Sequence, residues 1–275
     1  MLVPQQVSMI LSSNPASGAI NRSDDGSYFE VQLSDPLAIP SEALNVSLSV
    51  EEASVWWVVP NVITAENNLM YITGFNSSDV LTNFVLQIPT GLYDLSGLNS
   101  AILRELENAD AKISPNPLLT LTPDEPTQKV EIRFDYDNVS IDFTQANTFR
   151  DILGFNSQIL GTYASAPINV LADNIANFNS INFFLLHSDL TSSGIRFNDT
   201  YNQTVSQILI DVAAGSQIVN KPFNAAQIAA QELAGAKRTN VRMWLTDDQN
   251  RPVNTNGEYF TARIVIHYYK PYVIA

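Results

Sequence analysis

The last part of the chain alternates between hydrophobic and polar positions in two runs. The first run covers residues 241–246 and the second covers residues 260–269, with a loop rich in Asp, Asn, Pro and Gly between them. Period-two alternation is typical of a β-strand that turns one face toward a core. The pattern therefore predicts that the chain closes with two strands of one sheet.

The same alternation recurs along most of the chain. Further strands are predicted at residues 29–33, 44–59, 67–73, 83–88, 118–122, 130–136, 141–143, 175–190 and 206–212. The run at 44–59 is long for one strand, so we expect a bulge near Glu51 and Glu52. Many short strands separated by turn residues predict a sandwich or barrel. Periodicity alone does not give the strand order.

The period changes to that of a helix in the middle of the chain. Between residues 93 and 108, leucines and isoleucines recur three, four and four positions apart, which places them on one helical face. Asp94 or Ser96 is expected to cap this helix. A second, short helix is predicted with Asn147 as its N-cap and with Gly154 suited to its left-handed C-terminal position.

A third helix is predicted over residues 225–233, although its hydrophobic face is weak. With these signals, the chain divides into three stretches. Residues 1–87 and 160–275 carry mainly strand patterns, and residues 88–159 carry a mixed α and β pattern.

Length and composition limit the class of protein. The 275 residues are 45% hydrophobic, enough for one large β domain or two small ones. No hydrophobic run approaches the ~18–20 residues of a membrane span, and the start of the chain lacks the basic region of a signal peptide. The chain has no cysteine, which excludes disulfide scaffolds, Cys-based zinc sites and thiol catalysis.

The charge balance is strongly acidic. The formal net charge is −14, which repels phosphate backbones, and the single basic pair Lys237 and Arg238 is too small for a nucleic-acid patch. Nucleic-acid binding is therefore not expected. Charged residues make up only 15% of the chain, while asparagine occurs 27 times. The amides either form a surface that is easily desolvated in contacts between copies, or mark many turns.

The sequence offers no convincing catalytic arrangement. His187 is followed by Ser188 and Asp189, but neighbours on a strand point to opposite faces, so these three cannot converge as a triad. The G-x-S-x-G motif of hydrolases is also missing. We interpret His187 as structural and expect no catalytic residues, no cofactor and no enzyme activity.

One acidic turn could bind a cation. Asp247 and Asp248 precede Gln249 and Asn250, and their oxygens suit Ca²⁺. The spacing does not match an EF-hand loop. We therefore favour a solvated turn over a metal site, with Asp247 and Asp248 as weak metal candidates.

Two adjacent tryptophans, Trp56 and Trp57, invite a binding role. Together with Tyr71 and Phe75 they could form a platform that stacks on sugars. Consecutive strand residues face opposite sides, however, so at most one tryptophan enters a given core. Aromatic side chains are enriched at protein interfaces. We favour core plus subunit interface and keep a carbohydrate- or receptor-binding β-sandwich as the alternative.

Four short pieces occur in order through the middle of the chain. They are Pro89-x-Gly91-x-Tyr93, Leu98-Asn99-x-Ala101-Ile102, Ile141-Asp142-Phe143 and Leu153-Gly154-Phe155. With the closing strands, which flank Gly257 and Glu258, this order resembles the penton (vertex) proteins of adenovirus-like and Polinton-like double-stranded DNA viruses and related phages. The resemblance covers roughly residues 85–160 and 180–270. The chain is much shorter than an adenovirus penton base and has no evident integrin-type RGD loop.

The resemblance implies an all-β fold with minor α content. It would be a viral jelly-roll β-sandwich, with residues 1–87 and 160–275 as the jelly roll and residues 88–159 as an inserted α+β module. It further implies a structural virion protein at the capsid vertex of an icosahedral virus. A homopentamer would contact itself, the major capsid protein and, as a further candidate partner, a spike protein.

The major capsid protein, with two small jelly rolls in one chain, is the alternative role of the same class. In either role the subunits must meet through side chains that the fold leaves free. We expect the subunit interface to contain the aromatic and charged residues Trp56, Trp57, Arg242, Trp244, Arg263, His267 and Tyr269.

Overall fold

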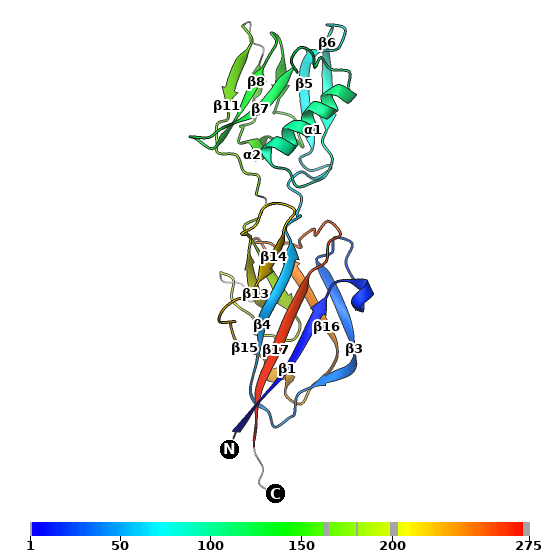
Figure 1. Cartoon of the computed structure of the whole chain (residues 1–275), viewed down its shortest axis with the longest axis vertical. Coiled ribbons are helices and arrows are strands. Elements are labelled where there is room, and N and C mark those ends of the chain that lie inside the picture. The colour runs from blue at the N-terminus through cyan, green and yellow to red at the C-terminus, as the bar shows by residue number, and fades with distance from the viewer. Residues whose placement is uncertain (1, 162–164, 180, 199–202, 272–275) are drawn as a thin grey trace. The chain divides into compact units, whose positions relative to one another are not determined.

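The computed structural model describes residues 2–161, 165–179, 181–198 and 203–271. They form two compact units (Figure 1): residues 1–59 together with 181–275, and residues 60–180. The inserted unit is therefore longer at both ends than the predicted 88–159. At the first end, β5 (Leu69–Phe75) pairs with β6 (Leu81–Gln87) and with β9 (Ser140–Asp142) inside that unit. At the other end, β11 (Ile168–Leu171) pairs with β8 (Lys129–Phe134).

The first unit consists of two sheets. One has the order β1-β17-β4-β14, with β15 also paired to β4. Its strands are β1 (Leu2–Ser12), β17 (Thr261–Pro271), β4 (Leu44–Trp56), β14 (Gln217–Asn220) and β15 (Ile228–Ala229). The other has the order β13-β12-β16-β3-β2. Its strands are β13 (Thr204–Leu209), β12 (Phe183–Ser188), β16 (Lys237–Thr246), β3 (Tyr28–Ala38) and β2 (Ala19–Ile20).

The strand order of this unit is that of a jelly roll. Counted along the chain without the short β2 and β15, the strands of the first sheet are the first, eighth, third and sixth. Those of the second sheet are the second, seventh, fourth and fifth, and all pairs are antiparallel. Two Greek keys wound into two facing sheets give this arrangement. The predicted all-β jelly-roll fold is confirmed, and the other unit is inserted between the third and fourth strands.

The two closing strands do not belong to one sheet, so that prediction is wrong. β17 pairs with β1 and β4, whereas β16 pairs with β3 and β12. A hairpin between neighbours needs a loop of only a few residues. Here residues 247–260 form a long connection that crosses between the sheets, and its Val253 and Phe260 side chains are buried.

A bulge in β4 decides which of its side chains face the core. Opposite β17, Arg263 pairs with Glu52 and Ile264 pairs with Val50, which leaves Glu51 as an extra residue. The expected bulge near Glu51 and Glu52 is confirmed. An extra residue reverses the alternation of side chains. The buried hydrophobic positions accordingly change from even to odd numbers: Val46, Leu48, Val50, Ala53, Val55 and Trp57.

The inserted unit contains two small sheets and two helices. The sheets have the orders β10-β9-β5-β6 and β11-β8-β7. The remaining elements are α1 (Leu95–Asn108), β7 (Leu119–Asp124), β8 (Lys129–Phe134), α2 (Arg150–Leu153), β10 (Ile159–Gly161) and β11 (Ile168–Leu171). One hydrophobic cluster joins residues of both sheets and both helices into a core of its own.

Both helices of the inserted unit were foreseen by their local signals. Asp94 caps α1 by accepting a hydrogen bond from the Gly97 N–H at 2.6 Å, and Leu98, Ile102 and Leu106 are buried. Gly154 ends α2 with φ 82°, and a Cβ there would lie 2.3 Å from the Asn174 carbonyl oxygen. Only glycine fits such a position.

Other local predictions differ from the structure. Phe149, not Asn147, is the N-cap of α2, and it has no side-chain cap bond. Residues 225–233 form β15 and a 3-10 helix (Gln231–Leu233) instead of an α-helix, in keeping with the weak hydrophobic face. Another 3-10 helix covers Pro15–Ser17. Asparagine provides seven of the eleven non-glycine residues with positive φ in the described chain, which supports its turn role.

Candidate interaction surfaces

The outer face of the sheet that contains β16 carries a pocket of about 430 Å³. Val241, Met243 and Leu245 turn inward and are fully buried, so Arg242 and Trp244 lie on the opposite, outer face. The lining includes Tyr28, Asp189, Gln203, Arg242, Trp244 and Pro252. We refer to this hollow as the Trp244 pocket.

His187 forms a rigid support for Trp244. The two rings are parallel within 5°, with centroids 5.3 Å apart. The imidazole nitrogens lie 2.7 Å from the Thr246 hydroxyl and 3.2 Å from the Thr204 hydroxyl, and the side chain is 1% exposed. Burial lowers the pKa of His187 to about 4, so the ring is neutral at pH 7. These contacts favour the structural role that we expected for His187.

The two residues after His187 are each engaged elsewhere. Ser188 is buried, and its hydroxyl accepts a hydrogen bond from the Leu190 N–H at 3.3 Å. Asp189 accepts one from the Arg242 N–H at 2.9 Å, and burial raises the pKa of its carboxyl group. A triad needs a chain of bonds from nucleophile to base to acid. The contacts of these three adjacent residues form no such chain.

Arg242 lies beside a carboxylate that is already well satisfied. Glu30 is 5% exposed and accepts hydrogen bonds from the side-chain amides of Asn21 at 3.1 Å and Asn240 at 2.6 Å. The hydrogen bond from Asn21, with that from Asn240, lowers the pKa of Glu30. The Arg242 Nε atom is 3.9 Å from Glu30, and its side chain is 55% exposed. A guanidinium has five donors, so Arg242 keeps donors for another partner.

The charged residues of β17 lie on the other sheet. The Arg263 guanidinium is 3.5 Å from the Glu51 carboxylate, and its Nε–H donates to the Ser8 hydroxyl at 3.3 Å. The His267 ring lies 3.3 Å from the Ser49 hydroxyl, and Tyr269 is exposed. The predicted interface residues of the two closing strands therefore belong to two separate surfaces: Arg242 and Trp244 lie on one sheet, and Arg263, His267 and Tyr269 lie on the other. Contact with a neighbouring subunit remains a prediction for each surface.

Of the two adjacent tryptophans, only Trp56 is available to a partner. Trp57 is 3% exposed and meets the Phe184 ring edge-on, with centroids 6.1 Å apart. Its predicted place in an interface is wrong, because the bulge turns it into the core of its own unit. Trp56 is half-buried on the other side of β4, opposite Gln217. Tyr71 and Phe75 belong to β5 in the inserted unit.

The acidic turn after β16 is held together by its own chain. The buried Asp247 carboxylate accepts hydrogen bonds from the N–H groups of Gln249 and Arg251, both at 2.8 Å, and from the Arg251 Nε–H at 2.7 Å. Asp248 accepts one from the Asn182 amide at 2.6 Å. The turn was expected to be solvated, but Asp247 is buried. Within the described residues, no cluster of three or more His, Asp or Glu side chains suits a metal ion.

We expect Asp247→Asn to destabilise the jelly-roll unit by roughly 1–2 kcal/mol, because it weakens charge-assisted hydrogen bonds of a buried carboxylate. The measurement is the urea midpoint of unfolding. Asp211→Asn is the matched control, since Asp211 is exposed and such changes usually stay within about 0.5 kcal/mol. Equal midpoints for the two variants would contradict the structural role of Asp247.

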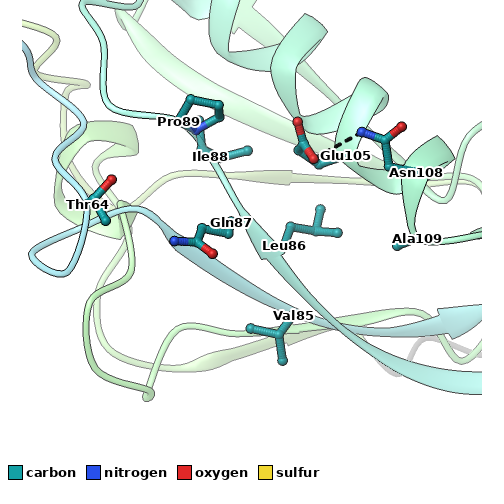
Figure 2. Close-up of a pocket in the computed structure, with 9 residues that line it drawn as sticks. All are labelled: Thr64, Val85, Leu86, Gln87, Ile88, Pro89, Glu105, Asn108 and Ala109. Carbon is teal, nitrogen blue, oxygen red and sulfur yellow. Dashed lines mark hydrogen bonds between the residues drawn. The ribbon is translucent and has the colours of Figure 1, made fainter.

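The inserted unit carries a pocket of about 500 Å³ between β6, the segment that follows it and α1 (Figure 2). Glu105 is the carboxylate in its lining, and Figure 2 shows its hydrogen bond with Asn108, 3.2 Å long. The Arg104 Nε–H also donates to Glu105 at 3.0 Å. Glycoside hydrolysis needs two facing carboxyl groups, and this lining offers one that is already paired.

The strand order and the insertion define a class: jelly-roll proteins that carry a second compact unit between their third and fourth strands. Among solved structures, the chain is similar to the mavirus penton protein, with 12% identity, 97% of this chain and 100% of that chain covered, and a TM-score of 0.48. It is also similar to a chain in the cryo-EM structure of the Sputnik virophage, with 16% identity, 95% and 97% covered, and a TM-score of 0.39. No protein-family model and no curated protein matches the chain. The jelly-roll assignment itself follows from the strand order.

Among the described residues, no helix is long and apolar enough to cross a membrane.

Proposed function

We propose that this chain is a structural virion protein that forms the vertex (penton) of an icosahedral capsid as a homopentamer. The observation that carries the proposal is the complete eight-stranded jelly roll with a second unit inserted between its third and fourth strands. The ordered sequence pieces that resemble penton proteins lie within that inserted unit. Assembly would proceed through contacts with further copies and with the major capsid protein.

The edges of the first sheet suit such an assembly. β1 is an end strand of eleven residues, paired only with β17 among the described strands. A long edge strand with unpaired backbone groups invites aggregation when it stays uncovered. A neighbouring subunit or the major capsid protein would cover it in a particle. The side chains of Arg242, Trp244 and Trp56 are likewise accessible to a partner.

The alternative functions find less support. A major capsid protein with two jelly rolls would need a second jelly roll, but the inserted unit has a four-stranded and a three-stranded sheet with helices. A sugar platform built on Trp56 and Trp57 would need both rings on one surface. Trp57 lies in the core instead.

Sedimentation velocity of the purified protein tests the proposal. We expect a closed oligomer that contains five copies of this chain. It should form either from the purified chain alone or after the major capsid protein is added. A chain that remains a monomer at high concentration and never enters particles would contradict the proposed function.

A further inference from the structure

Phe223 is the most exposed large hydrophobic side chain of the described residues, at 99%. Scattered hydrophobic side chains on a surface are ordinary, but a phenylalanine presents an unusually large hydrophobic area. Its loop, residues 221–227, is held at both ends. The Asn220 amide donates to the Ser206 hydroxyl at 3.3 Å, and Ile228 pairs with Leu48. The loop therefore presents Phe223 to solvent from a fixed base.

The Trp244 pocket has the features of a receptor for such a side chain. Tyr28, Trp244 and Pro252 contribute hydrophobic surface, and the volume of about 430 Å³ exceeds that of one aromatic side chain. His187 holds the Trp244 ring by stacking and is itself fixed by two threonine hydroxyls. A preformed pocket loses little entropy when it is filled.

The Phe223 loop and the pocket lie on different surfaces of the same unit. The loop connects β14 with β15, which pair with β4 in one sheet (Figure 1), whereas the pocket lies on the outer face of the other sheet. A contact between two different patches is heterologous. Repetition of such a contact produces a ring when the rotation between copies closes, and an open filament when it does not.

We propose that Phe223 of one copy inserts into the Trp244 pocket of a neighbouring copy. The inference rests on the proposed capsid function and specifies the contact that would join the subunits. The charges at the two surfaces are compatible with it. Near the Phe223 loop, the Lys221 ammonium lies 3.9 Å from the Glu52 carboxylate, and the pocket carries the anion Asp189 and the cation Arg242. Lys221 approaching Asp189 and Glu52 approaching Arg242 would each meet a charge of opposite sign.

The first test compares self-association by sedimentation equilibrium. Phe223→Ala should weaken it by about 30-fold or more, the effect of removing a buried aromatic anchor from an interface. Phe223→Leu should restore part of the affinity. Ile159→Ala is the matched control, because Ile159 is 60% exposed and belongs to the inserted unit. The inference predicts no change for this control.

The second test uses the absence of cysteine from the chain. Asn224→Cys next to Phe223, combined with Arg242→Cys at the pocket, should form disulfides between copies on mild oxidation. A heterologous contact then gives a ladder of dimers, trimers and larger species that ends at the closed ring. Each single-cysteine variant should give dimers at most. Adding Phe223→Ala to the double variant should remove the ladder.

The outcomes separate this contact from the proposed function. If the native protein forms a closed oligomer but Phe223→Ala associates equally well and no ladder appears, the Phe223 contact is wrong and the capsid role stands. If the native protein never associates and never enters particles, both are wrong. A ladder that depends on Phe223 supports both.

Discussion

Trp57→Ala is expected to destabilise the jelly-roll unit by about 3–5 kcal/mol, the usual cost of removing a large aromatic side chain from a core. Trp57 is 3% exposed and meets Phe184 edge-on, so alanine would leave a cavity that neighbouring strands cannot fill. Single domains are stable by only about 5–15 kcal/mol. The variant should therefore lose a large share of its stability, seen in urea unfolding followed by far-UV circular dichroism.

Trp56→Ala is the matched control for this experiment. The same side chain is removed one residue earlier, from the half-buried opposite side of β4. We expect a loss of about 1 kcal/mol or less. If the two variants lost equal stability, the bulge at Glu51 would not orient the two tryptophans as described.

The buried neutral His187 should make the jelly-roll unit less stable in acid. Its pKa is about 4 in the folded chain and 6.5 as a free side chain, so the ring is neutral in both states only at pH values well above 6.5. Between these values the unfolded state binds a proton that the folded state does not, and stability is lost as the pH falls. From pH 7 to pH 4.5 the loss should reach roughly 2 kcal/mol.

His187→Gln isolates this contribution from that of the carboxylates, which titrate in the same range. Glutamine keeps polar atoms near Thr204 and Thr246 but does not titrate. The variant should be less stable than the native protein at pH 7, and the difference should shrink by roughly 2 kcal/mol at pH 4.5. A difference that stays constant across this range would show that His187 does not hold its low pKa.

Helix faces, helix ends and strand runs could be predicted from the sequence because each depends on residues that are close together in the chain. The spacing of Leu98, Ile102 and Leu106 forms the hydrophobic face of α1 wherever the helix is placed. Gly154 is needed where a left-handed residue ends α2. The excessive length of the run at 44–59 correctly indicated a bulge near Glu51.

Pairing over long sequence distances could not be predicted in this way. The alternation in β16 and β17 is the same whether the two strands pair or lie in different sheets, and only the Greek-key order separates them. β1 was not foreseen, because its segment carries Pro4, Gln5 and Gln6 and is made a strand by pairing along the whole of β17.

The candidate surfaces likewise depend on strand pairing and on contacts between residues that are far apart in the sequence. One extra residue at Glu51 decides that Trp57, and not Trp56, enters the core. Residue types alone pointed to Trp244 as an interface residue, but its pocket is formed with Tyr28 and Asp189, far away in the sequence. The sequence pattern did not identify Phe223 as an interface residue, because a single phenylalanine in a loop carries no periodic signal.

The copy number of this chain in purified, genome-filled particles decides whether it is a vertex protein. Quantitative mass spectrometry should find it in a constant, minor ratio to a more abundant major capsid protein. Its absence from particles, or its presence as the dominant protein, would contradict the vertex assignment.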